Sequence, residues 1–233
     1  ALQLTSFGAD YRALVVGSSG ALGQAFCHLL REDPGCAGVT ELSRATQPGF
    51  DLLEPASITA AVQSLAAQAP YHLVLIATGV LHDAEIQPEK SLAAIDAEAM
   101  QKVFQINSIG PAVLLQQLLP LLERKGALAV LSARVGSIAD NRLGGWYAYR
   151  ASKAALNMLL KTAAIEHARR YPEARLLSLH PGTVVSPLSQ PFRGSAAARP
   201  ALQAAAELLA VVDNSKASDS GSFFAYDGAV VPW

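Results

Sequence analysis

Arg12-Ala-Leu-Val-Val-Gly17-Ser-Ser-Gly20-Ala-Leu-Gly23 is the stretch that decides the fold of this chain. The apolar run that ends at Val16 is typical of a buried strand, and a helical pattern follows from Gln24 to about Arg31. Glycines between the two elements allow the backbone to approach an anion, and the free N–H groups of the helix start point toward it. The predicted pyrophosphate contacts are Gly17, Ser18, Ser19, Gly20, Ala21, Leu22 and Gly23. A tight turn that binds no ligand would show the same pattern.

Strand and helix patterns alternate along the rest of the chain. Strands are predicted at residues 38–43, 72–76, 127–131, 175–179 and 222–225, with a further short strand at 49–52. Helices are predicted at residues 55–69, 97–122, 149–171 and 201–212. This alternation indicates an α/β fold of the Rossmann type, in which helices cover both faces of a doubly wound parallel sheet. We expect residues 1–233 to form a single domain.

Composition excludes several functional classes. Hydrophobic residues make up 51% of the 233 residues and charged residues 16%, which is a globular composition, and the net charge is −1. Such a balance argues against nucleic acid or an anionic membrane as a partner. No basic segment followed by an apolar run opens the chain, and no apolar run approaches 18 residues, so neither a signal peptide nor a membrane span is expected. With only two cysteines, the cytoplasm is the default compartment, and the five histidines predict no metal site.

The end of the second predicted strand bears on the choice of dinucleotide. In dinucleotide-binding folds this position, about 20 residues past the first glycine, faces the adenosine ribose. Here it carries Ser43 and Arg44, and a guanidinium favours a 2′-phosphate. Glu41 has the opposite charge but lies inside the strand. We therefore expect NADP(H) rather than NAD(H).

Tyr149 and Lys153 open the predicted helix at 149–171 and stand one turn apart on the same face. A phenol has a pKa of about 10, which an adjacent ammonium lowers. The pair can then serve as a general acid/base for a carbonyl or an alcohol. An ordinary surface Tyr and Lys four residues apart is the alternative for this motif taken alone.

Together these stretches resemble the short-chain dehydrogenase/reductase family over nearly the whole chain. The matching residues are Gly17 to Gly23, Ala77, Thr78 and Gly79, Asn107, Tyr149 with Lys153, and Pro181, Gly182 and Thr183 after a strand. The run from Gly144 to Asn157 is similar to a branch with carbonyl-reductase-like and C-factor-like signalling proteins. The resemblance implies that Tyr149 is the acid/base, that Lys153 lowers its pKa and binds the nicotinamide ribose, and that Asn107 holds a water in a proton relay. It also implies that Pro181, Gly182 and Thr183 border the nicotinamide, that Ala77, Thr78 and Gly79 lie beside the cofactor, and that Asp51 and Leu52 lie near the adenine.

One position departs from the family pattern. The serine expected to polarise the substrate carbonyl is Ala133, so Ser132 or Ser137 would have to replace it. The loss of such a donor costs about 10² to 10³ in rate. Two functions follow: an NADPH-dependent oxidoreductase that reduces a carbonyl or C=N group, and an NADP-binding signalling or scaffold protein with weak catalysis.

Partners are predicted from weaker signals. The resemblance implies a homodimer or homotetramer. Residues 186–199 are expected to form a lid over a small-molecule carbonyl substrate, and their apolar composition favours an apolar or aromatic one.

Overall fold

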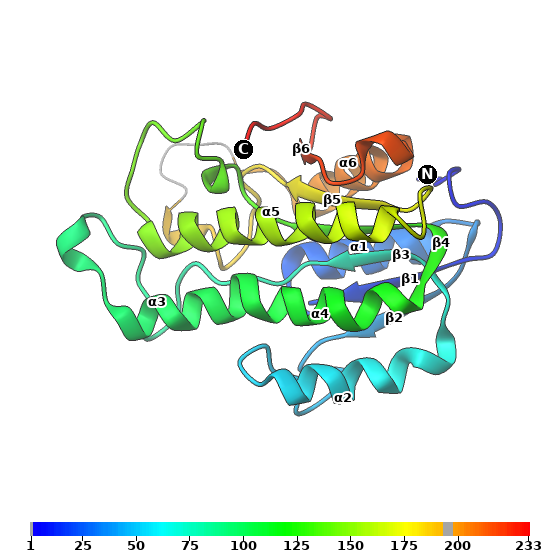
Figure 1. Cartoon of the computed structure of the whole chain (residues 1–233), viewed down its shortest axis with the longest axis horizontal. Helices are drawn as coiled ribbons and strands as arrows, with labels where there is room; N and C mark the ends of the chain where they lie inside the picture. Colours follow the sequence, from blue (N-terminus) through cyan, green and yellow to red (C-terminus); the bar gives the residue numbers. More distant parts are fainter. Residues whose placement is uncertain (1, 193–197) are drawn as a thin grey trace.

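The computed structural model describes residues 2–192 and 198–233, and six parallel strands of this part of the chain form one sheet in the order β2-β1-β3-β4-β5-β6 (Figure 1). The strands are β1 (Tyr11–Val16), β2 (Cys36–Leu42), β3 (Tyr71–Ile76), β4 (Leu122–Leu131), β5 (Arg175–His180) and β6 (Phe223–Ala225). This confirms the predicted doubly wound sheet. The strand order reverses between β1 and β3, and ligands of open α/β sheets bind at the carboxyl ends of the strands at such a point.

Helices cover both faces of the sheet. The α-helices are α1 (Ala21–Glu32), α2 (Pro55–Leu65), α3 (Ala97–Phe104), α4 (Gly110–Leu118), α5 (Tyr147–Ala168) and α6 (Ala201–Asn214). The short 3₁₀ turns are η1 (Ala66–Gln68), η2 (Leu92–Ala94), η4 (Leu119–Leu121), η5 (Arg134–Gly136), η6 (Gln190–Phe192) and η7 (Ala217–Asp219), and η3 (Gln105–Ile109) is a π-helical turn between α3 and α4. Figure 1 shows α4 and α5 on one side of the sheet and α1 and α6 on the other.

Alternate residues of β1 supply two separate cores. Leu14 and Val16 join the core shared with α2, α4 and α5, whereas Ala13 and Val15 join the core shared with α1 and α6. All four side chains are fully buried. Successive side chains of a strand point to opposite faces, and both faces of this sheet are covered, which explains the uninterrupted apolar run in the sequence.

Two strand predictions differ from the structure by more than two residues. Residues 49–52 form no strand, so that prediction is wrong. The hydroxyl of Ser57 accepts a bond from Asp51 N at 2.9 Å and donates one to Asp51 O at 2.8 Å, which satisfies the backbone groups that a strand neighbour would pair. The strand predicted at 127–131 begins earlier, at Leu122; the prediction missed its first part because the charged residues 123–125 resemble a loop in the sequence.

In the part of the chain that the structure describes, no helix combines the length and the hydropathy that a membrane crossing requires.

Candidate active site

The glycine loop between β1 and α1 is packed too closely for side chains. A Cβ atom on Gly17 would lie 2.8 Å from Ala77 O, and one on Gly23 would lie 2.1 Å from Gly17 O. The loop also reaches β2, since Gly17 N donates to Leu42 O at 2.7 Å. Gly20 precedes α1 without any side-chain cap, so the N–H groups of the first turn remain available to an anion. The loop therefore has the form that a pyrophosphate requires.

Three hydroxyl groups near this loop are buried without a partner in the described residues. They belong to Ser18, Thr78 and Ser132, which follow the ends of β1, β3 and β4. Buried polar groups are nearly always hydrogen-bonded in native proteins, and exceptions tend to mark functional positions. All three strands end at the same edge of the sheet, so these groups fit a polar ligand bound along that edge.

Two charged residues near the end of β2, Glu41 and Arg44, bear on the choice of cofactor and differ in their surroundings. Glu41 is paired with Arg31 of α1. Ser43 is buried and its backbone N–H donates to Thr46 Oγ1 at 2.9 Å, whereas Arg44 is exposed. Glu41 is thus paired with a helix residue, whereas Arg44, just past the end of the strand to which the glycine loop bonds, is exposed.

The other predicted cofactor contacts follow the carboxyl ends of β2 and β5. Leu52 is packed against Gly110, and its carbonyl accepts a bond from Gln105 Nε2 at 3.1 Å. Its neighbour Asp51 is half-buried. Pro181, Gly182 and Thr183 directly follow β5, and Gly182 has a positive φ of 73° that suits glycine.

Tyr149, Lys153 and Asn107 converge at the tip of β3. Lys153 Nζ donates to Leu131 O at 3.0 Å and lies 5.9 Å from the centre of the Tyr149 ring. A Cβ atom on Gly79 would lie 3.2 Å from Lys153 Nζ and 3.5 Å from Asn107 Oδ1. Gly79 after β3, Asn107 of the π-helical turn and Lys153 of α5 thus lie close together, and a side chain at position 79 would crowd the amine.

The pKa values of the Tyr149–Lys153 pair differ from the expected direction. Burial raises the pKa of Tyr149 to about 12, and burial lowers the pKa of Lys153 to about 8. Burial disfavours the charged form of both groups. In the protein alone, the amine of Lys153 contacts a backbone carbonyl and faces the tyrosine ring, so it does not lower the pKa of the phenol.

Asn107 lies in the π-helical turn and is fully buried. Its side chain pairs with the backbone of Val80 through two bonds of 2.8 Å and donates to Ser152 Oγ at 3.1 Å. The carbonyl of Asn107 receives no bond from the residue four positions on, because that residue is Pro111 and has no N–H. The side chain of Asn107 therefore joins three elements, and the irregular helix alters the bonding of its carbonyl.

The segment after β4 contains the position without a donor. Ala133 precedes the η5 turn in an extended conformation. Ser137 is buried, and its hydroxyl accepts a bond from Asp140 N at 3.1 Å within the turn. Of the two serines considered as replacements, Ser132 has a buried hydroxyl without a partner in the described residues.

Glu89 and Trp146 hold the start of α5 and were not among the residues selected from the sequence. Both carboxylate oxygens of Glu89 lie 3.2–3.3 Å from Ala148 N, and Glu89 O accepts the N–H of Trp146. Trp146 has a left-handed conformation, with φ 54° and ψ 46°. Glu89 is distant in sequence, so no local pattern could indicate its contact, but the pair Gly144-Gly145 could have indicated an unusual turn before α5.

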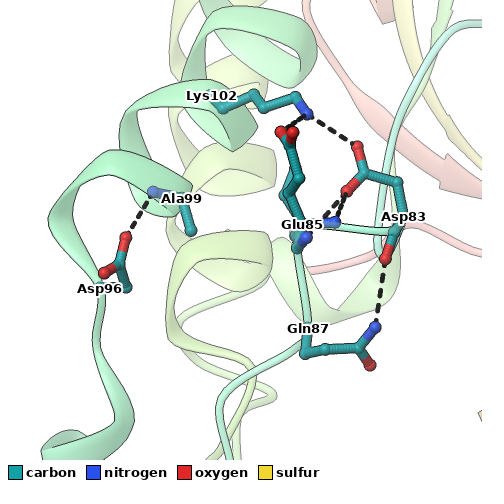
Figure 2. A network of polar contacts seen from close by, with 7 residues as sticks. Asp83, Glu85, Gln87, Asp96, Ala99 and Lys102 are labelled. Atoms are coloured by element: carbon teal, nitrogen blue, oxygen red, sulfur yellow. Dashed lines mark hydrogen bonds and ion pairs between the residues drawn. The ribbon is translucent and has the colours of Figure 1, made fainter.

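The segment that leads to Glu89 is fixed to α3. Figure 2 shows Lys102 of α3 between Asp83 and Glu85, with N–O distances of 3.0 and 2.7 Å. Asp83 Oδ1 also accepts the backbone N–H groups of Glu85 and Ile86, each at 2.8 Å. Because α3 continues into the π-helical turn, this network connects the segment that caps α5 to the helix that carries Asn107.

Part of the predicted lid lies outside the described residues. Of residues 186–199, the structure describes 186–192 and 198–199, whereas 193–197 lie outside. Phe192 lies beside Trp146, with ring centres 5.5 Å apart.

Comparisons of the sequence find relatives over most of the chain. A family model described as enoyl-(acyl carrier protein) reductase matches residues 38–231. A Rhodococcus protein named 1-hydroxy-2-glutathionyl-2-methyl-3-butene dehydrogenase is 32% identical over 201 residues, which cover 86% of this chain and 84% of that protein. The C-signal protein of Myxococcus xanthus is 39% identical over 147 residues, which cover 61% of this chain and 84% of that protein.

Solved structures show the same fold. The NADPH-bound carbonyl reductase from chicken fatty liver superposes with a TM-score of 0.83 over 97% of this chain and 95% of that chain. Its sequence identity is 23%, so the similarity concerns the fold alone.

Proposed function

Because this chain belongs to the short-chain dehydrogenase/reductase family and is an oxidoreductase of that type, we propose that it reduces a small-molecule carbonyl or C=N group with NADPH, with Tyr149 as the proton donor. The observation that carries the proposal is the convergence of Tyr149, Lys153 and Asn107 beside the glycine loop, at one edge of the sheet. A nicotinamide cofactor would supply a hydride to the substrate carbon.

Residues along the sheet edge would hold the cofactor. The free N–H groups of the α1 start and the hydroxyl of Ser18 would bind the pyrophosphate. Thr78 and Gly79 would border its nicotinamide half, together with Pro181, Gly182 and Thr183. Lys153 would bind the ribose hydroxyls.

The pKa of Tyr149 supports the reducing direction. A phenol with a pKa of about 12 stays protonated at neutral pH, so it can donate its proton to a substrate oxygen that gains negative charge. The lysine, with its pKa at about 8, remains mostly protonated at neutral pH and would stabilise that charge. Asn107 would hold a water that returns a proton to the site.

Replacement of Tyr149 by phenylalanine tests the proposal. We expect Tyr149→Phe to lower kcat by at least about 10²-fold, since a general acid contributes about 10² to 10⁴. NADPH oxidation is followed by absorbance with a panel of aldehydes, ketones and quinones, and NADPH affinity is measured by titration. Tyr147→Phe is the matched control, because Tyr147 is exposed two residues away on the same helix. Retained turnover in Tyr149→Phe would remove this residue from its role.

We also propose that Arg44 selects NADP(H) through the 2′-phosphate. Arg44→Ala should raise the Kd of NADPH by about 10-fold or more, the worth of one charge-assisted pair, and leave the Kd of NADH nearly unchanged. Arg124 lies near the amino end of β4, at the edge of the sheet opposite to that of Arg44. Arg124→Ala therefore removes an equal charge away from the proposed site and should change neither Kd. Equal weakening of both cofactors by Arg44→Ala would contradict the assignment.

A signalling or scaffold function is the second candidate. It is supported by Ala133, which lacks the donor, and by the similarity to the C-signal protein. Tight binding of NADPH without Tyr149-dependent turnover of any substrate would favour it. Assembly as a homo-oligomer stays a prediction, and the exposed apolar side chains of Ile109, Met158 and Ile165 are consistent with it.

A further inference from the structure

Three aromatic rings from separate segments form a chain that ends on Tyr149. The ring centres of His82 and Phe192 lie 5.2 Å apart, those of Phe192 and Trp146 lie 5.5 Å apart, and those of Trp146 and Tyr149 lie 6.1 Å apart. Each pair meets edge to face, with interplanar angles of 68–71°. We call His82, Trp146 and Phe192 the aromatic wall.

The aromatic wall is not part of a packed core. His82, Trp146 and Phe192 are each half-buried, and none of them belongs to the buried clusters formed by the described residues. Trp146 therefore presents ring surface beside Tyr149, and no buried cluster of residues 2–192 and 198–233 includes the wall.

The backbone holds Trp146 in place at an energetic cost. Gly144, Gly145 and Trp146 are three successive residues with positive φ, at 64°, 65° and 54°. Glycine adopts this conformation freely, but a bulky side chain does not. Strained residues persist where the surrounding structure determines them, and they cluster at functional sites.

Contacts on every side fix this conformation. Glu89 O accepts the N–H of Trp146, and Trp146 O accepts Arg150 N at 2.8 Å. Arg150 Nε also donates to the carbonyls of Gly144 and Gly145, at 3.2 and 2.9 Å. These bonds fix the backbone at Trp146 and thereby the position from which its indole extends.

We propose that the aromatic wall is a specificity site that binds a planar aromatic group of the substrate beside Tyr149. This inference rests on the proposed function and names the substrate class. Aromatic rings favour edge-to-face and offset-stacked neighbours, so an aromatic ketone gains contacts there that its saturated counterpart does not. Trp146 would be the main contact, since it touches both Tyr149 and Phe192.

Two substrates of similar size test the proposal. We expect Trp146→Gly to raise the KM for acetophenone by about 10-fold and to change the KM for cyclohexyl methyl ketone by less than about 2-fold. Glycine suits the left-handed conformation, so this variant is expected to fold. Trp146→Phe restores a ring and should recover most of the preference. Equal changes for both ketones would show a purely structural role and overturn the proposal.

A binding measurement separates this proposal from the proposed function. The chain has two tryptophans, and Trp233, which stacks on Phe223, can be replaced by phenylalanine. In Trp233→Phe, 1-phenylethanol should change the fluorescence of Trp146. The change caused by 1-cyclohexylethanol should be no more than about twice the scatter seen with buffer additions. A response to 1-phenylethanol in a protein without turnover would refute the oxidoreductase proposal alone. Turnover of both ketones with no such response would refute the aromatic site alone.

Discussion

Ala133 has no hydroxyl at a position where a donor would assist a developing oxyanion, while the hydroxyl of the adjacent Ser132 is buried without a partner in the described residues. Successive residues of an extended segment point to opposite sides, so only one of the two positions can face the substrate. We expect Ala133 to be the facing position. The chain would then reduce its substrate with Tyr149 as the main donor.

Two substitutions, Ala133→Ser and Ser132→Ala, determine which of the two positions faces the substrate. Ala133→Ser should raise kcat by about 10-fold or more, because one donor at an oxyanion contributes about 10² to 10³ in optimised sites. Ser132→Ala, which removes a hydroxyl one residue away, should change kcat by less than about 2-fold. Both are measured with saturating NADPH. The reverse result, with loss in Ser132→Ala and no gain in Ala133→Ser, would identify Ser132 as the donor.

At the scale of an element, α5 depends on a cap from another segment. Tyr147 is its first residue, and the carboxylate of Glu89 accepts Ala148 N where the helix leaves its N–H groups unpaired. A negative charge at this end also complements the helix dipole. The proposed catalytic pair, Tyr149 and Lys153, follows within the next two turns, so the cap helps to position it.

Glu89→Ala should lower the free energy of unfolding by about 1–2 kcal/mol, the usual worth of a helix cap. Glu89→Gln keeps an acceptor and should lose less than half of that amount. Urea unfolding measures both. Glu85→Ala removes an exposed carboxylate from the same segment and should cost under about 1 kcal/mol, as exposed ion pairs do. If Glu85→Ala and Glu89→Ala cost the same, the capping role is wrong.

The π-helical turn is an element that the sequence predicted only in part. Gly110-Pro111 indicated that the long helix is interrupted, and α3, η3 and α4 do form one irregular run. The sequence did not show that Gly110 N would bond to Gln105 O, five residues back, instead of the usual four. That choice depends on packing, since a Cβ atom on Gly110 would lie 3.0 Å from Leu52.

At the scale of the whole molecule, the stability of the fold should depend on His180 in acid. Burial, with Arg134 and Arg199 nearby, lowers the pKa of His180 to about 4, against the opposing effect of Asp227 and Asp140. Its Nδ1 accepts Arg134 N at 3.1 Å, which requires the neutral ring. The unfolded chain therefore binds a proton near pH 6.5 that the folded chain binds only near pH 4, and stability falls as the pH falls through this range.

His180→Asn provides the comparison, because an amide oxygen can replace the acceptor without a titration. Between pH 7 and pH 4.5, we expect the wild type to lose about 2–3 kcal/mol more unfolding free energy than the variant. Urea unfolding at the two pH values gives the difference. Equal losses in both proteins would mean that His180 titrates alike in the folded and unfolded chains.

Local signals predicted most of the fold, whereas contacts between distant segments were not predictable. Most strands contain an apolar run bounded by glycines or polar residues, so the order of elements could be read from the sequence. The Tyr149–Lys153 pair was identified by its spacing. In contrast, the contact of Glu89 with α5 joins segments 59 residues apart, and the pKa of Tyr149 depends on burial.

The crowded glycine loop has a consequence for how this protein can evolve. A methyl group at Gly17 or Gly23 would overlap backbone atoms, so these positions admit no gradual change. Arg44 lies on the surface, where substitution disturbs no packing. If the cofactor binds as proposed, positions closed to mutation hold the part that all dinucleotides share, and a position open to mutation lies beside the part that distinguishes them. Single substitutions at the surface could then change the cofactor preference during evolution while the glycine loop is retained.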